Sequence, residues 1–284
     1  MYFHRLSAPR INGDSRHETG FRAIWVATRE TAYLDPLLWD NAGSVEGGVF
    51  HSRSHRDGNL IVALRAEGVG GVAYRHGEAN SGGQYEQQGF GRFTGELSVR
   101  RRFGPFVAGV RGYAGAFLSA DPPPAQRAIP VSGADPYQTL SNPWIRSEGA
   151  LLSGGDVFYQ APGHANLRGY RPGASGRWVG SVNLELEGDL YRADRGVLRR
   201  ASLLGFWDGG LADTLVVRSF EGRAYRILVD GGVGARVWLA IGALHFPIRI
   251  EFPLYVSEPA ISLDRDRTVE FVDFRWLISV QPIF

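Results

Sequence analysis

Residues 176–189, Gly-Arg-Trp-Val-Gly-Ser-Val-Asn-Leu-Glu-Leu-Glu-Gly-Asp, alternate between two kinds of side chain. One set of alternate positions is apolar or small: Trp178, Gly180, Val182, Leu184 and Leu186. The intervening positions are polar or charged: Arg177, Ser181, Asn183, Glu185 and Glu187. Successive side chains of a β-strand point to opposite faces, so this stretch predicts a strand with one apolar and one charged face.

Four later stretches repeat this pattern, near residues 197–210, 226–240, 242–256 and 270–284. In the last of them, one face holds Val272, Phe274, Trp276, Ile278, Val280 and Phe284, and the other holds Asp273, Arg275, Ser279 and Gln281. Towards the N-terminus, strands are predicted near 17–30, 43–55, 58–76, 88–102 and 104–118, and 58–76 is long enough to hold two. The total is ten to twelve strands. Bacterial single-chain barrels usually have an even number of strands.

The composition narrows the class of protein. The 284 residues are 44% hydrophobic and include 38 Gly and 15 Pro, but no run approaches the roughly 18 apolar residues of a membrane-spanning helix. Cysteine is absent, which excludes disulfide frameworks and thiolate metal sites. Every one of the 31 basic residues is Arg, and because they are dispersed among 29 acidic residues, no nucleic-acid partner is predicted.

These features predict an all-β protein, a transmembrane antiparallel up-and-down β-barrel with about 12 strands visible. Apolar side chains are expected to face lipid, and charged ones to face the lumen. Residues 1–284 are expected to form a single barrel domain. Residues 119–175, rich in Pro, Gly, Ser and Asp, are expected to form one long loop folded into the lumen.

The end of this loop carries Arg168-Gly169-Tyr170, and a later strand carries Phe206-x-Asp208-x-Gly210. A guanidinium donates two parallel hydrogen bonds to a carboxylate, so Arg168 is predicted to pair with Asp208. We expect Glu185 or Glu187 to accept from the remaining donors. Gly169 permits close approach to the wall, and Tyr170 offers a ring and a hydroxyl. Because a lumen is wet, the pair is expected to fix the loop's position more than to stabilise the barrel.

A second Arg-Gly-Tyr sequence, Arg111-Gly112-Tyr113, lies within a predicted strand before the loop. We favour the Arg168 site, because only there do an acidic strand and the Phe-x-Asp-x-Gly strand follow at short spacing.

This order of loop motif, acidic strand and partner motif resembles the bacterial surface-antigen superfamily of outer-membrane barrels, which includes BamA, TamA and the two-partner secretion transporters. The resemblance implies that Arg168 contacts Asp208 inside the lumen, and that the terminal Phe284, on a strand that also carries Trp276, acts as an insertion signal. The superfamily usually has sixteen strands, five of them after the loop. Because too few residues precede the loop here, either several first strands are missing or the barrel is smaller.

The resemblance further implies an outer-membrane location in a Gram-negative bacterium, contact with outer-membrane lipid, and an unfolded or secreted protein client. The N-terminal residues lack the apolar core of a secretory signal, so we expect the chain to be part of a longer protein with an upstream periplasmic or enzymatic domain. The client and the upstream domain are left open.

Enzymatic signals are weak, and neither catalytic residues, metal nor cofactor is predicted. His51 and His55 lie four apart on a strand end, the Gly231–Gly234 run lacks a strand-to-helix context, and Ser175 has no recognisable partners. Three functions remain open: a barrel that inserts or secretes proteins, a membrane anchor or export barrel for a fused soluble domain such as a peptidase or lipase, and a gated passive channel.

Overall fold

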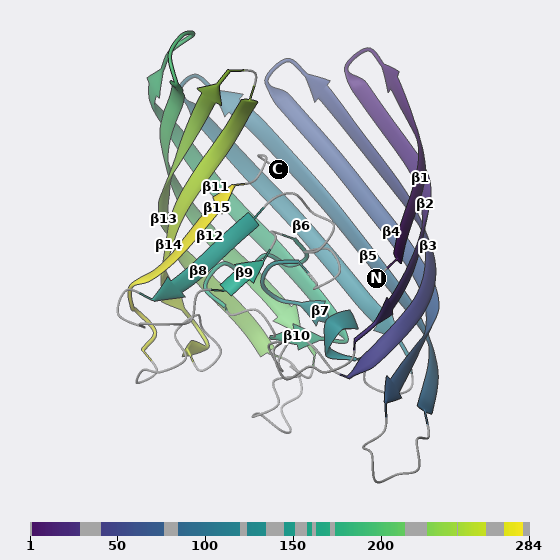
Figure 1. Cartoon of the computed structure of the whole chain (residues 1–284). Helices are drawn as coiled ribbons and strands as arrows, with labels where there is room; N and C mark the ends of the chain where they lie inside the picture. The colour runs from purple at the N-terminus through teal and green to yellow at the C-terminus, as the bar shows by residue number, and fades with distance from the viewer. Residues whose placement is uncertain are drawn as a thin grey trace.

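The computed structural model describes residues 2–28, 41–76, 85–119, 124–134, 145–150, 158–160, 163–170, 174–213, 226–242, 244–259 and 270–280. Eleven long strands form the wall of an antiparallel up-and-down β-barrel (Figure 1). They are β1 (Tyr2–Asn12), β2 (Ser15–Ala27), β3 (Ala42–Asp57), β4 (Leu60–His76), β5 (Tyr85–Phe103), β6 (Phe106–Leu118), β11 (Trp178–Arg192), β12 (Leu198–Ala212), β13 (Arg226–Ile241), β14 (Leu244–Val256) and β15 (Arg275–Val280). Each pairs with its predecessor in the wall, so the sheet is continuous from β1 to β15.

Connections between the wall strands differ in length at the two ends of the sheet. Short turns join β1 to β2, β3 to β4, β5 to β6, β11 to β12 and β13 to β14, and they lie together at the top of Figure 1. Each of the five turns places a glycine in the left-handed region, for example Gly58 with φ 53° and Gly104 with φ 57°, which a side chain would disfavour. We call this the short-turn end, and the opposite end the long-loop end.

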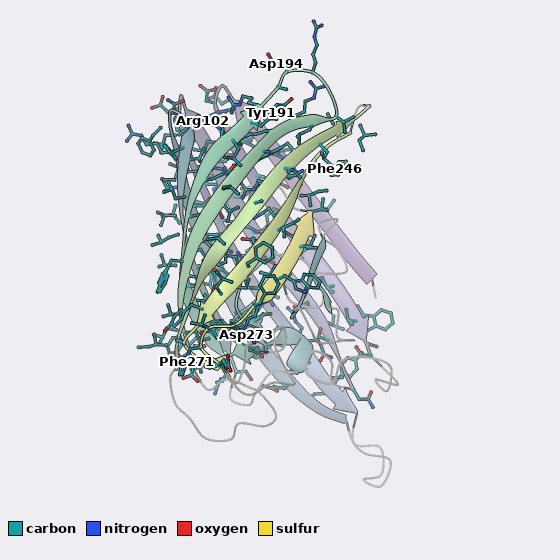
Figure 2. All side chains as sticks on the ribbon, turned by 90° about the vertical axis from the view of Figure 1, so that its left-hand side faces the viewer. Arg102, Tyr191, Asp194, Phe246, Phe271 and Asp273 are labelled. Atoms are coloured by element: carbon teal, nitrogen blue, oxygen red, sulfur yellow. The ribbon has the colours of Figure 1, made fainter. Side chains whose placement is uncertain are left out.

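The alternation predicted for residues 176–189 is present along the wall. On β11, Leu186 is 56% exposed and points outward, while its neighbour Glu187 is completely buried. On β12, Trp207 is 51% exposed and Asp208 is completely buried. The apolar faces therefore point away from the enclosed space, and the charged faces point into it. Figure 2 draws the side chains along the strands, with Tyr191 and Asp194 at the short-turn end and Phe271 and Asp273 at the other.

For two of the predicted strands, the structure differs from the sequence-based expectation. Residues 58–76 form the single strand β4 and not two. Regular pairing of the final strand covers only Arg275–Val280 and not 270–284, because residues 270–274 contribute just the isolated bridge between Val272 and Tyr255. Residues 281–284, with Phe284, lie outside the described part of the chain.

β1 was not predicted, because its sequence contains Pro9 and lacks a clear apolar alternation. It nevertheless pairs with β2 along its whole length, from Tyr2 opposite Trp25 to Asn12 opposite Ser15. Proline is tolerated on an edge strand, where one side of the backbone needs no partner. Among the described residues, no strand pairs with the other side of β1.

Part of the described chain between β6 and β11 lies inside the wall, as predicted, but this interior segment has structure of its own. It holds a 3-10 helix (Ala125–Arg127), a small sheet of β7 (Ile129–Pro130) with β10 (Ser175–Gly176), and the strands β8 (Ile145–Ala150) and β9 (Phe158–Gln160). β8 pairs with β15 on the side away from β14, and β9 pairs with β8. The segment therefore extends the sheet beyond β15 as well as filling its interior.

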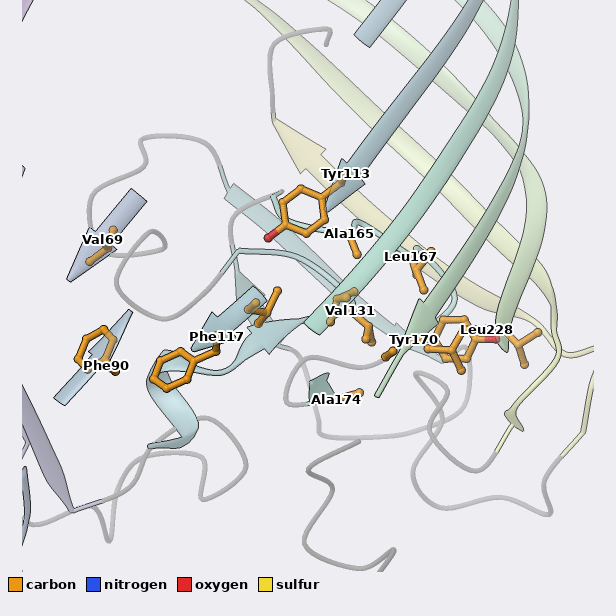
Figure 3. Close-up of a cluster of buried hydrophobic side chains, with 14 of the residues drawn as sticks. Val69, Phe90, Tyr113, Phe117, Val131, Ala165, Leu167, Tyr170, Ala174 and Leu228 are labelled. Atoms are coloured by element: carbon orange, nitrogen blue, oxygen red, sulfur yellow. The ribbon is translucent and has the colours of Figure 1, made fainter. Parts of the chain in front are cut away.

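A hydrophobic core joins this segment to the inner wall towards the long-loop end (Figure 3). From the segment come Val131, Ala165, Leu167, Tyr170 and Ala174, and from the wall come Tyr113, Phe117 and Leu228, among others. The core thus lies inside the barrel, where it holds the segment against strands β6 and β11–β13. None of the described helices is long and apolar enough to cross a membrane.

Candidate functional site

Residues 163–170 run along the inner wall just before β10, and their backbone conformation presents Arg168 to it. His164 and Asn166 adopt left-handed φ angles of 46° and 52°, which turn the chain twice within a few residues. Ser181 on β11 donates to the carbonyl of Ala165 at 2.8 Å. Asn183, two residues further along the same strand, donates to the carbonyls of Ala165 and Asn166, each at 3.2 Å. The polar inner face of β11 therefore satisfies the backbone of this turn.

Arg168 makes the contact that the sequence predicts. Its Nε and Nη2 donate to the two carboxylate oxygens of Asp208, each at 2.7 Å, which is the bidentate geometry of a guanidinium–carboxylate pair. Phe206 lies beneath the pair, with the guanidinium carbon 3.8 Å from the centre of its ring. The Phe-x-Asp spacing places the ring and the carboxylate on the same inner face of β12, so one strand supplies both contacts.

The remaining guanidinium nitrogen of Arg168 reaches two further strands. Nη1 donates to Glu251 on β14 at 2.7 Å and to Glu185 on β11 at 3.2 Å. Arg168 is only 1% exposed, so one side chain from the interior segment joins strands β11, β12 and β14 away from water. The expectation of a wet pair was wrong: the interior is packed here, and each buried charge depends on its partners.

Glu185 and Glu187 have different roles, although they are two residues apart on one face. Glu185 also accepts from Arg236 at 3.0 Å and from Arg249 at 2.7 Å. Glu187 does not contact Arg168. It accepts from Arg100 at 3.1 Å, from Arg200 at 2.7 Å and from Arg236. Because successive inward positions on a strand are separated by about 7 Å, only Glu185 is within reach of Arg168, and Glu187 belongs to a layer nearer the short-turn end.

Positive and negative side chains around Arg168 form one buried group. Arg168, Arg236 and Arg249 face Asp208, Glu185 and Glu251, and Arg249 bonds both glutamates. Sequence reasoning missed Arg236, Arg249 and Glu251. Each lies at an inward position of a predicted strand, so alternation indicated its face, but not which residue it would meet.

Two glycines allow the segment to lie close to the wall. A Cβ on Gly169 would lie 2.8 Å from the Cβ of Asp230, and one on Gly210 would lie 2.6 Å from Cδ1 of Leu167. Neither glycine has a φ in the left-handed region, so close approach, and not backbone freedom, explains both residues.

Tyr170 fixes the end of the motif. Its hydroxyl donates to the carbonyl of Val229 at 2.9 Å, accepts from the amide of Val229 at 3.1 Å and lies 3.1 Å from the hydroxyl of Ser257. Burial of the ring raises the pKa of Tyr170 to about 12, so its hydroxyl stays protonated and able to donate at neutral pH.

The second Arg-Gly-Tyr sequence also holds the interior segment. Arg111 on β6 donates to Asn183 at 2.9 Å, to Glu96 at 2.8 Å and to the carbonyl of His164 at 2.5 Å. The hydroxyl of Tyr113 lies 2.6 Å from Nδ1 of His164. Arg111 thus anchors the start of the turn that Arg168 anchors at its end. The sequence-based preference for the Arg168 motif missed this role of Arg111. Both motifs hold the same eight residues, 163–170.

A further contact lies across the barrel. Arg127, in the 3-10 helix of the interior segment, pairs with Glu46 on β3 and lies with its guanidinium carbon 6.0 Å from the ring centre of Phe90 on β5. Trp276, the other residue assigned to an insertion signal, lies on the outward face of β15. In the described part of the chain, no group of three or more His, Asp or Glu side chains is arranged to hold a metal ion.

No family model matches the sequence, and no curated protein matches it. Among solved structures, the chain is similar to CdiB from Acinetobacter baumannii, with 12% sequence identity and a TM-score of 0.34. The similarity covers 98% of this chain and 49% of the CdiB chain, so this chain spans about half the length of that protein. The function proposed below therefore rests on the geometry of the chain itself.

Proposed function

We propose that this chain forms an outer-membrane β-barrel of a Gram-negative bacterium that takes part in inserting or secreting proteins. The proposed role is non-enzymatic. Its client is an extended polypeptide, which takes the place of β8 on the edge of β15, where no strand in the described part of the chain joins β15 to β1.

The membrane location is supported by the sidedness of the wall. Exposed large hydrophobic side chains lie on the outer faces of most wall strands, including Phe21, Val49, Phe93, Leu184 and Trp207. Salt-bridged Arg, Asp and Glu side chains are buried on the inner faces. A water-soluble protein would gain by burying the first set and hydrating the second, whereas a lipid environment favours the arrangement seen here.

One observation carries the proposed role in protein handling. The edge of β15 that faces the opening pairs with β8, an extended piece of the interior segment, over six residues from Arg275 opposite Ala150 to Val280 opposite Ile145. An edge that accepts one extended chain offers the same backbone donors and acceptors to another. We propose that β8 occupies the position that a client strand takes during its passage.

The contacts of the interior segment weigh against a simple passive channel. Arg168, Arg111 and Arg127 each tie the segment to the wall by buried hydrogen bonds or ion pairs. Conduction would require all these contacts to break, whereas displacement of β8 from β15 leaves them intact.

The location is tested by fractionation. We expect the chain to be recovered with outer membranes and to migrate differently on gels before and after heating. Recovery in the soluble fraction without detergent would contradict the membrane location.

The role of the β15 edge is tested with a disulfide, which is simple because the chain has no cysteine. Ser147 and Ile278 are directly opposed partners on β8 and β15, so Ser147→Cys with Ile278→Cys should lock the two strands together. Locked cells should show the same loss of outer-membrane or secreted proteins as cells depleted of the chain, and reductant should restore them.

The matched control is Val182→Cys with Gly209→Cys, which joins opposed residues on β11 and β12. That pair stays together in the proposed mechanism, so its disulfide should have no effect. If the Ser147–Ile278 disulfide forms fully and the protein content of the membrane and the medium stays normal, the edge is not where clients pair.

A further inference from the structure

Five basic or imidazole side chains gather on the outer face of the first three strands: Arg10, His17, His51, Arg53 and His55. We call them the basic patch. Their outward direction follows from the alternation of each strand. Phe21 on β2 and Val49 on β3 are 47% and 63% exposed, and His17, His51, Arg53 and His55 lie an even number of residues from them on the same strands. On β1, Arg10 shares the face of His17, because the two residues are directly opposed in the sheet.

The registers of the sheet place three members of the patch in one row. Arg10 on β1 is directly opposite His17 on β2, and His17 is directly opposite Arg53 on β3. Neighbouring strands are about 4.8 Å apart, so the Cα atoms of the two arginines are about 10 Å apart with His17 between them. Long arginine side chains span that distance, so both guanidiniums can reach one small anion above His17.

Carboxylates in this region lie almost entirely on the opposite face. Glu18, Glu46, Glu67 and Glu96 occupy inward positions of β2, β3, β4 and β5, and β1 has no acidic residue. The one outward carboxylate described on these strands is Asp57, at the turn four residues beyond Arg53, or about 13 Å along the strand. The row therefore holds two guanidiniums about 10 Å apart with no carboxylate beside them on the outer faces of the described strands, which favours a negative partner from outside the chain.

Two of the histidines are already oriented. The hydroxyl of Thr19 lies 2.9 Å from Nδ1 of His51, and that of Ser15 lies 2.8 Å from Nδ1 of His55. When the hydroxyl donates to Nδ1, the ring proton lies on Nε2 and can be donated to an anion. Guanidinium and imidazole N–H groups together suit a phosphate, which accepts several hydrogen bonds at once.

The patch also lies at a suitable depth. On β2, the exposed apolar residues Trp25 and Phe21 are followed, in the direction of the short-turn end, by Thr19, His17 and Ser15. On β3, Val45 and Val49 are followed in the same direction by His51, Arg53 and His55. Hydrocarbon-facing side chains thus give way to cationic ones where lipid headgroups would begin.

We propose that the basic patch binds the headgroup phosphate of an anionic phospholipid, in the leaflet at the short-turn end of the barrel. The proposal rests on the proposed membrane location, since the outer face meets lipid only in a membrane. Along the middle of β11–β13, the described outward residues are apolar and offer no comparable site; they include Val182, Leu184, Leu203, Trp207 and Val233.

The test compares two double variants of the purified chain in nanodiscs. Arg10→Gln with Arg53→Gln removes both arginines of the row. Arg16→Gln with Arg65→Gln is the matched control, since these arginines lie on the inner face of β2 and β4 with side chains 62% and 54% exposed. Native mass spectrometry counts the phosphatidylglycerol that each variant retains from nanodiscs of phosphatidylcholine with a minor fraction of phosphatidylglycerol.

We expect the outer variant to bind phosphatidylglycerol about thirty-fold more weakly than the unaltered chain, and the inner variant to bind it normally. Equal retention by both variants would overturn the inference, as would full competition by inorganic phosphate, which would show a site for free anions and not for lipid. If instead no form of the chain enters nanodiscs of either composition, the proposed membrane location itself fails.

Discussion

Arg168 supplies hydrogen bonds to carboxylates on three different strands, and it does so with almost no exposure to water. Removing one member of a buried charged group leaves the others without a partner, which typically costs about 3–5 kcal/mol. The cost falls first on the segment that Arg168 brings to the wall, because the wall strands keep their backbone hydrogen bonds. Arg168 therefore matters more for the position of the interior segment than for the stability of the barrel.

Arg168→Ala is expected to release residues 163–170 while the barrel stays inserted. Hydrogen exchange of the segment's amides should rise, and limited proteolysis should cut there, with unchanged heat-dependent migration. Arg168→Lys keeps the charge but not the planar fork, so it should restore only part of the protection. Unchanged exchange and unchanged activity in both Arg168→Ala and Asp208→Ala would show that the pair does not hold the segment.

Asp208 and Asp230 are directly opposed and completely buried, but only Asp208 bonds Arg168 among the contacts described. Asp208→Asn removes one of the two acceptor oxygens and should weaken docking of the segment by about 3 kcal/mol. Asp230→Asn keeps a side chain that can still hydrogen-bond to Asp208 and to the backbone of Gly169, so its effect should stay within about 1 kcal/mol. Hydrogen exchange of residues 163–170 distinguishes the two variants, and equal effects would show that Asp230 shares in holding Arg168.

At the scale of elements, β6 and β12 hold opposite ends of one short turn. Arg111 on β6 bonds the carbonyl of His164, and Asp208 on β12 bonds Arg168. Both contacts hold the same conformation of residues 163–170, so their contributions to the stability of the docked segment should not be independent. The turn is therefore better described as one docked unit than as a series of separate contacts.

A double-mutant cycle of Arg111→Ala and Arg168→Ala measures this coupling. We expect an interaction free energy of about 0.5–3 kcal/mol in the stability of the docked segment. Either substitution alone should already release much of the turn that the other arginine holds. Arg102→Ala is the control, because Arg102 pairs with Asp189 at the short-turn end, away from the turn (Figure 2). Its effect should add to that of Arg168→Ala, and additivity in both cycles would mean that the two contacts act separately.

For the whole molecule, the decisive property is that most exposed large apolar side chains lie on the outer face of the wall. Leu184 and Leu190 both point outward on β11, the first near the middle of the strand and the second near the short-turn end. In a bilayer their depths differ, whereas in water both positions would simply be exposed. Substitution at the two positions therefore separates a membrane protein from a soluble one.

Leu184→Arg is expected to lower the free energy of unfolding in lipid vesicles by about 2–4 kcal/mol, because it places a charge near the middle of the bilayer. Leu190→Arg should cost only about 0–1 kcal/mol, because its side chain reaches the headgroups. Denaturant titration followed by tryptophan fluorescence measures both variants. Equally small losses would place the outer face in water.

Much of this architecture is encoded locally. The period-two alternation of residues 176–189 and of the later strands determines which face of each strand is apolar, because the geometry of an extended chain leaves no other choice. The same alternation places Asp208 and Glu185 on the inner face, and the chemistry of a guanidinium makes Asp208 a natural partner of Arg168. The sequence by itself therefore determined the all-β class, the sidedness of the wall and the central ion pair.

Only the tertiary structure decided which distant residues complete the site and where the sheet ends. Glu251 joins Arg168 from 83 positions away, β1 forms despite Pro9, and β8 leaves the interior segment to pair with β15. It also showed that the space around Arg168 is packed, not wet. These features depend on the registers between strands and on how tightly the segment fits the curved wall, and no local pattern specifies either. Alternation gives each side chain a direction, whereas folding supplies its partner.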